Sequence, residues 1–257
     1  MKGIITTIIL LTVNCLLNAQ SNSLLSLATV ANMKLSSPTT VILNDPIAVG
    51  FSDDLENING GPFYDNKWLK GRILLKDGQE LGSEWLFKYN TFQDELHVLL
   101  VSGEVKIPLK SHIQAFMIEQ DGQQHYFVSS DFAGVTGKQT TNTFFEVLHH
   151  DRFTLLKKSS KHHGQLNNNS FYCSSCGDAS FDFFYTAETY YVKDNQGEFK
   201  ELKIKRRDIL KAFPKHKSLI VSYLKKNKSK VKTETDLLTL LQYIESPKDG
   251  SNEDITE

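Results

Sequence analysis

Cys173 and Cys176, separated by two serines, form the clearest chemical motif in the sequence. Two thiols at this spacing can close a local disulfide, act as a redox dithiol or supply half of a zinc site. A thioredoxin-like dithiol begins a helix after a βαβ strand, whereas this segment is rich in Asn and Ser. We therefore predict a disulfide or inert pair. The alternatives are a metal site completed by His162 and His163, and a redox role.

Acid-base chemistry has weaker candidates. Asp53-Asp54 and Asp94-Glu95 are neighbouring acids, but adjacent residues of a strand point to opposite faces, so we expect solvated charges. The sequence contains no GxSxG, HExxH, Walker-type or GxGxxG motif. It therefore predicts no catalytic residue and no cofactor, and it favours a protein that is not an enzyme.

A strongly basic segment is the most quantitative feature. Residues 200–232 contain 13 Lys and Arg against two acids, a formal charge of +11 in a chain whose net charge is −1, so the rest of the chain is acidic. One interpretation is docking to an anionic surface. The other is that lysines line the wet faces of short helices and pair loosely with an acidic β region. The candidate docking residues are Lys203, Lys205, Arg206, Arg207, Lys211, Lys225 and Lys226.

The elements that position these residues belong to a chain of ordinary composition. It has 257 residues, of which 40% are hydrophobic and 23% charged, which excludes collagen-like, low-complexity and strongly disordered chains. Three cysteines cannot staple a chain of this length as they do a disulfide-rich miniprotein. The length allows one or two domains with a sizeable core.

Residues 1–19 have the pattern of a signal peptide. Lys2 precedes an apolar stretch that ends at Leu17-Asn18-Ala19, where Ala19 suits a signal peptidase. A lipid-modified Cys15 and a membrane anchor are the alternatives. We expect export by the general secretory route to the periplasm or the cell exterior, as a soluble mature chain with no transmembrane segment. That compartment argues against nucleic acid as a partner and leaves an anionic envelope surface or another envelope protein.

In the middle of the chain, apolar and polar residues alternate with a period of two. After an irregular lead-in (20–60), short alternating segments are separated by turn signals such as Asp77-Gly78 and Asp121-Gly122. These features predict an antiparallel β region over 61–205, interrupted by a polar loop at 159–180. Many strands in one meander tend to curl in order to limit exposed edges. We therefore expect a barrel-like or sandwich core.

From residue 206 the spacing of apolar residues becomes that of a helix. Apolar residues recur at helical spacing over 206–246, with Pro214 as a break and Thr233 or Thr235 as a possible N-cap. Helices this short must pack on each other or on the sheet, and residues 247–257 form a polar tail that we expect to be disordered. The predicted fold class is α+β: an antiparallel β meander with short, basic C-terminal helices.

Several segments carry a resemblance to a group of proteins. GGPFYDNKW (60–68), KGRILLKDGQ (70–79), FKYNTFQDEL (87–96) and FFEVLHHDRFTLLKK (144–158) resemble uncharacterised secreted or periplasmic β-rich proteins of Bacteroidota. The similarity extends through the helical end and covers most of residues 60–246. It implies a secreted β-rich protein with a helical C-terminus and implies no activity.

These observations give one leading hypothesis and two alternatives. The chain is expected to be an exported, non-enzymatic binding or envelope-associated protein. The alternatives are a secreted hydrolase whose site is not visible in the sequence, and a metal or redox role through Cys173 and Cys176. Convergent histidines and carboxylates in a polar pocket would favour the enzyme, whereas a filled β core with a basic outer face would favour binding.

Overall fold

The structure is a computed structural model that describes residues 58–137, 140, 142–167, 180–194, 197–226 and 231–246. The chain divides into two compact units, here called unit 1 (Met1–Val147 and Lys157–Glu188) and unit 2 (Leu148–Leu156 and Thr189–Glu257). The predicted signal peptide, most of the lead-in, the two cysteines of the motif and the tail lie outside the described residues.

The fold class is α+β, as predicted. The strands among the described residues are β1 (Leu69–Leu75), β2 (Glu80–Leu81), β3 (Leu86–Asn90), β4 (Glu95–Leu99), β5 (Val105–Lys106), β6 (Ile113–Gln120), β7 (Gln123–Ser129), β8 (Phe144–His150), β9 (Phe153–Asn167), β10 (Ser180–Asp194) and β11 (Lys200–Leu202). Their order in the sheet is β11-β10-β9-β8-β7-β6-β1-β3-β4-β5, with β2 paired to β1. This path is open rather than closed into a barrel.

The helices are short. They are η2 (Lys110–His112), α2 (Ser130–Ala133), α3 (Arg206–Ala212), η3 (Pro214–His216), α4 (Lys217–Lys226) and α5 (Glu234–Glu245). Within the described part of the chain, no helix has the length and apolar character needed to cross a bilayer.

Asp-Gly turns set the hairpins, as the sequence predicted. Asp121 and Gly122 both have positive φ (50° and 78°) and join β6 to β7 in register, with Gln120 opposite Gln123. Two positive φ angles define the type I′ turn, whose twist matches that of the flanking strands. Gly78 (φ 88°) closes the β1–β2 hairpin, where its N–H donates to the Leu75 carbonyl.

The core of unit 1 forms because its sheet folds over at β1, which pairs with both β3 and β6. Tyr89 of β3 contacts Phe116, Phe127 and Phe144, which come from β6, β7 and β8, with ring centroids 5.2 to 6.1 Å apart. Gly71 permits the fold, because a Cβ there would meet the Phe87 ring at 2.8 Å and the Met117 carbonyl. Unit 1 is therefore a filled, sandwich-like core.

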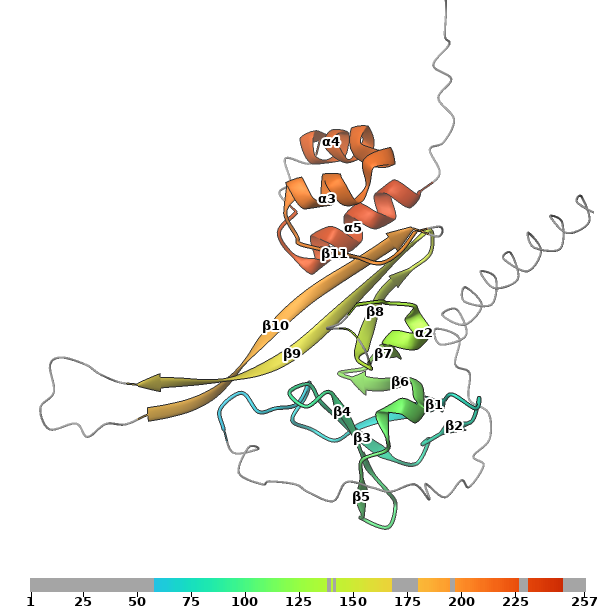
Figure 1. Ribbon diagram of the computed structural model, residues 1–257, viewed down its shortest axis with the longest axis vertical. Helices are drawn as coiled ribbons and strands as arrows, with labels where there is room; N and C mark the ends of the chain where they lie inside the picture. The colour runs from blue at the N-terminus through green and yellow to red at the C-terminus, as the bar shows by residue number, and fades with distance from the viewer. Residues whose placement is uncertain are drawn as a thin grey trace, which may run out of the picture. The chain divides into compact units, whose positions relative to one another are not determined.

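Unit 2 joins α3, η3, α4 and α5 to β11 and to the segments of β8, β9 and β10 that belong to it (Figure 1). Its core combines strand residues with the apolar faces of α3, α4 and α5. The fully or almost fully buried members include Phe153, Leu155, Val192, Leu202, Ile209, Ile220, Leu237, Leu240 and Leu241. The helices thus bury their apolar stripes against the sheet, as their length requires.

Two polar devices fix α5 within unit 2. Thr233 is its N-cap and forms a capping box with Asp236, which decides between the two caps that the sequence allowed. At the other end, the buried Glu245 carboxylate accepts a hydrogen bond from the Phe153 N–H (2.7 Å) and lies 2.6 Å from His149 Nε2. Both ends of the helix are therefore tied by specific bonds.

The predicted polar loop at 159–180 is wrong at both ends, because residues 159–167 and Ser180 are in strands; residues 168–179 lie outside the described residues. β9 continues to Asn167 and β10 begins at Ser180. Each strand has 15 residues, and the two run side by side as a long ribbon (Figure 1). The sequence missed this because exposed polar residues in a ribbon show no apolar alternation. The Phe184 N–H donates to the Asn59 carbonyl (2.8 Å), which anchors the ribbon within unit 1.

The capping box predicts an asymmetry between two threonines of the same helix. Thr233→Ala should lower the free energy of unfolding by about 1 kcal/mol, because the Asp236 N–H loses its acceptor. Thr235→Ala is the matched control and should change it by less than about 0.5 kcal/mol. Urea unfolding followed by the helical circular dichroism signal measures both, and equal losses would contradict the assignment of Thr233 as the cap.

Candidate functional site

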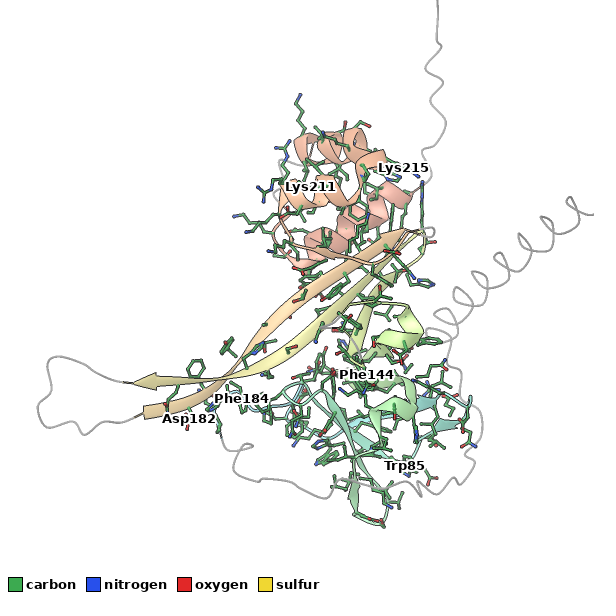
Figure 2. The ribbon with its side chains drawn as sticks, in the orientation of Figure 1. Trp85, Phe144, Asp182, Phe184, Lys211 and Lys215 are labelled. Carbon is green, nitrogen blue, oxygen red and sulfur yellow. The ribbon has the colours of Figure 1, made fainter. Side chains whose placement is uncertain are left out.

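The seven predicted docking residues are all exposed in unit 2. We call them the cationic face, and they are Lys203, Lys205, Arg206, Arg207, Lys211, Lys225 and Lys226. The first two precede α3, the next three lie on α3 and the last two end α4. Figure 2 shows nitrogen-tipped side chains projecting outward from these helices, with Lys211 labelled on α3.

The position of α3 explains this exposure. Ile209 is fully buried in the core of unit 2. Arg207 and Lys211 are four residues apart and so lie on one face of the helix, which is opposite Ile209 at about 100° per residue. Burying the apolar side of α3 therefore directs both cations to solvent.

In the described structure, few acids lie within ion-pair distance of the cationic face. Arg207 lies 3.5 Å from its sequence neighbour Asp208, and among the described residues no acid lies within 4.0 Å of the other six charged groups. The exposure of these cations agrees with both interpretations of the basic segment, whereas the loose ion pairing of the second is seen among the described residues only at Arg207.

Three described acids of unit 2, Glu234, Asp236 and Glu245, form internal bonds. Glu245 accepts from Phe153 and contacts His149, while Glu234 accepts from the Tyr190 hydroxyl (3.1 Å). Hydrogen bonds from the backbone of Lys232 and from Thr233 lower the pKa of Asp236. These acids stabilise the fold, and the cations face water.

A buried polar network in unit 1 is the strongest alternative to the cationic face as a candidate functional site. Glu146 of β8 lies 2.7 Å from His125 Nδ1 of β7 and 2.9 Å from Lys157 Nζ of β9. The Tyr64 hydroxyl lies 3.0 Å from the same His125 nitrogen. Burial raises the pKa of the Glu146 carboxyl, but the His125 hydrogen bond and the Lys157 charge outweigh burial, so the pKa is lowered.

This network has one feature of an acid-base site. A carboxylate at Nδ1 orients an imidazole and leaves Nε2 available for proton transfer. The side chain of His125 is 21% exposed, whereas those of Glu146 and Lys157 are 5% and 10% exposed. The three titratable groups come from three neighbouring strands, and their contacts also hold the sheet together. The hydroxyl that contacts this network is that of Tyr64.

The predicted metal ligands are only partly described. His162 and His163 lie on β9, where the pleat directs them to opposite faces. His162 stacks on Tyr185 (centroids 5.4 Å apart), and His163 Nε2 lies 3.4 Å from Asp182 of β10, which Figure 2 labels. In the described ranges no three metal-ligating side chains gather, and because Cys173 and Cys176 lie outside them, the disulfide and zinc predictions remain predictions.

Asp94 differs from its expected role as a solvated charge. Its backbone has φ 59°, and its carboxylate accepts from the Tyr89 hydroxyl (2.6 Å) and from Lys110 Nζ (2.8 Å). Burial and the neighbouring Asp94 charge raise the pKa of Tyr89 well above its ordinary value. Asp94 thus joins three segments of unit 1, which its sequence position gave no means to foresee.

Comparison with family models, curated proteins and solved structures found no match to this chain.

The Glu146–Lys157 pair predicts a pH dependence of stability. Because the folded pKa of Glu146 lies below its ordinary value of 4.5, its contribution is present above that pH and is lost as the pH falls through the folded pKa. The double variant Glu146→Gln/Lys157→Met removes both charges and should lose less stability between neutral pH and pH values below 4.5 than the wild type. Denaturant unfolding at a series of pH values measures the difference.

A surface pair provides the control. Lys106 Nζ lies 3.6 Å from Glu104, whose side chain is 59% exposed, and Glu104→Gln/Lys106→Met makes the same chemical change. This control should keep the wild-type pH dependence, because exposed pairs contribute little. A Glu146 double variant with an unchanged pH profile would exclude the network as a source of acid sensitivity.

Proposed function

We propose that the chain is an exported, non-enzymatic binding protein that docks to a phosphate-bearing lipid surface of the cell envelope through its cationic face. The observation that carries the proposal is the exposure of all seven residues, six of which have no acid within 4.0 Å in the described structure. The signal-peptide pattern of residues 1–19 supports export.

The physical basis is long-range attraction. Each Lys or Arg close to an anionic lipid surface contributes about 1 kcal/mol, and the contributions fall off within a Debye length. Several exposed cations on one unit can therefore hold a protein at such a surface without a transmembrane segment or a lipid anchor.

A lipid surface fits the cationic face better than a structured partner does. Recognition of single-stranded nucleic acid needs exposed aromatic platforms among the cations, whereas the aromatics near the cationic face, Phe199, Phe213 and Tyr223, are buried or partly buried. Protein interfaces usually have an apolar centre, whereas these seven residues are all charged. Docking by charge alone is sufficient for a fluid array of phosphates.

Vesicle binding tests the proposal. The protein should bind vesicles that contain phosphatidylglycerol and should not bind vesicles of phosphatidylcholine alone, as measured by co-sedimentation. Arg207→Gln/Lys211→Gln removes two charges from one face of α3 and should weaken binding by about 2 kcal/mol, or about thirtyfold. High salt should also weaken vesicle binding by the wild type.

The matched control changes two exposed lysines of unit 1. Lys67→Gln/Lys70→Gln alters the net charge by the same amount and should leave vesicle binding close to that of the wild type. Equal losses for both double variants would mean that net charge, not the cationic face, governs binding. If the protein binds neither vesicle type but captures an envelope protein, the proposed lipid surface is wrong and the partner is a protein.

A further inference from the structure

A pocket in unit 2 lies apart from the cationic face. It has a volume of about 120 Å³ and is formed where the start of β9, the end of β10 and β11 meet the junction between α3 and η3. Its cationic lining residues include Lys193, Lys200 and Lys215, none of which belongs to the cationic face.

The floor of the pocket is apolar and belongs to the core. Phe153, Val192 and Phe213 line it, and each is at most 3% exposed. The rings of Phe153 and Phe213 meet edge to face with centroids 5.0 Å apart, and the His216 ring lies 5.4 Å from Phe153. A floor fixed by core packing is preformed, so a ligand does not have to order it.

The rim is cationic. Lys193 is half-buried with its ammonium 4.4 Å from the centroid of Phe199, and burial lowers its pKa from the ordinary 10.5. Lys200 and Lys215 are exposed, and the described lining also includes the acid Glu198. A partly desolvated ammonium interacts more strongly with an anion than an exposed one does, because the local dielectric constant is lower.

We propose that this pocket binds a small organic carboxylate, with its carboxylate at the lysine rim. Its compact apolar body contacts the apolar lining, to which the more accessible Ala212 and Pro214 contribute beside the phenyl floor. The small volume suits such a ligand, because pockets for drug-sized molecules measure about 300–1,000 Å³. The apolar floor favours an organic anion over an inorganic one, since burial of apolar surface adds to the ion pairing. The proposal does not depend on lipid binding by the cationic face.

Three probes separate the parts of this inference. Phenylacetate combines a ring with a carboxylate, phenylacetamide keeps the ring without the charge, and inorganic phosphate keeps charge without the ring. Titration of the full-length protein, followed by backbone amide chemical shifts, should show phenylacetate perturbing residues 192–193, 212–213 and 215–216, which flank Pro214. Each of the other two probes should bind about tenfold more weakly, because a hydrogen bond to a charged group and the apolar contact each contribute on that scale.

Variants of the rim locate the site. Lys193→Met and Lys215→Met should each weaken phenylacetate binding by about tenfold, and Lys215 is useful because its exposed side chain can change without disturbing the core. Lys232→Met, an exposed lysine of unit 2 outside the pocket and outside the cationic face, is the matched control and should bind as the wild type does.

Three results would overturn the inference. Equal affinity for phenylacetate and phenylacetamide would show that the lysines of the rim do not bind the carboxylate charge. Stronger binding of phosphate than of phenylacetate would show that the floor contributes nothing. Equal losses in Lys215→Met and Lys232→Met would show that the anion binds by diffuse attraction rather than in the pocket. Loss of vesicle binding in the cationic-face variant would leave the pocket proposal intact.

Discussion

Contact between the helices and the strand segments of unit 2 supports every proposed binding feature of this protein. α3, α4 and α5 have 7, 10 and 12 residues, lengths at which isolated helices are marginal in water. Their stability comes from burial against Phe153, Leu155 and Val192, each of which contributes about 1.5–3 kcal/mol when fully removed from water. Glu245 fixes the geometry of this contact, because its carboxylate accepts a hydrogen bond from the Phe153 backbone N–H and contacts the His149 imidazole.

This contact also sorts the charges of unit 2. Acids lie where the packing needs hydrogen-bond acceptors, at the start of α5 and at its end. Cations occupy helix faces that the core does not use, as Arg207 and Lys211 do opposite Ile209. A nearly neutral chain can therefore present a local excess of positive charge, since three acids of unit 2, Glu234, Asp236 and Glu245, are engaged in internal bonds.

The sequence predicted features that depend on nearby residues. The Asp121-Gly122 turn, the cap at Thr233 or Thr235 and the exposed cations of α3 all follow from local patterns. It failed where partners come from distant strands. Glu146 is one acid in an alternating segment, and its bonds to His125 and Lys157 depend on a strand register that no local pattern sets. The pocket was missed for the same reason, because its lysines and phenyl rings come from separate elements.

The cationic face and the pocket use the same charge in physically different ways. Exposed ammonium groups act through water, so salt screens them and they distinguish little beyond the sign of a surface. Lys193 is half-buried beside Phe199, where screening is weaker and the shape of the floor restricts what can approach. One basic unit can thus combine unspecific attraction to a surface with selection of a small ligand, because the same core that exposes the first set of cations partly buries a member of the second.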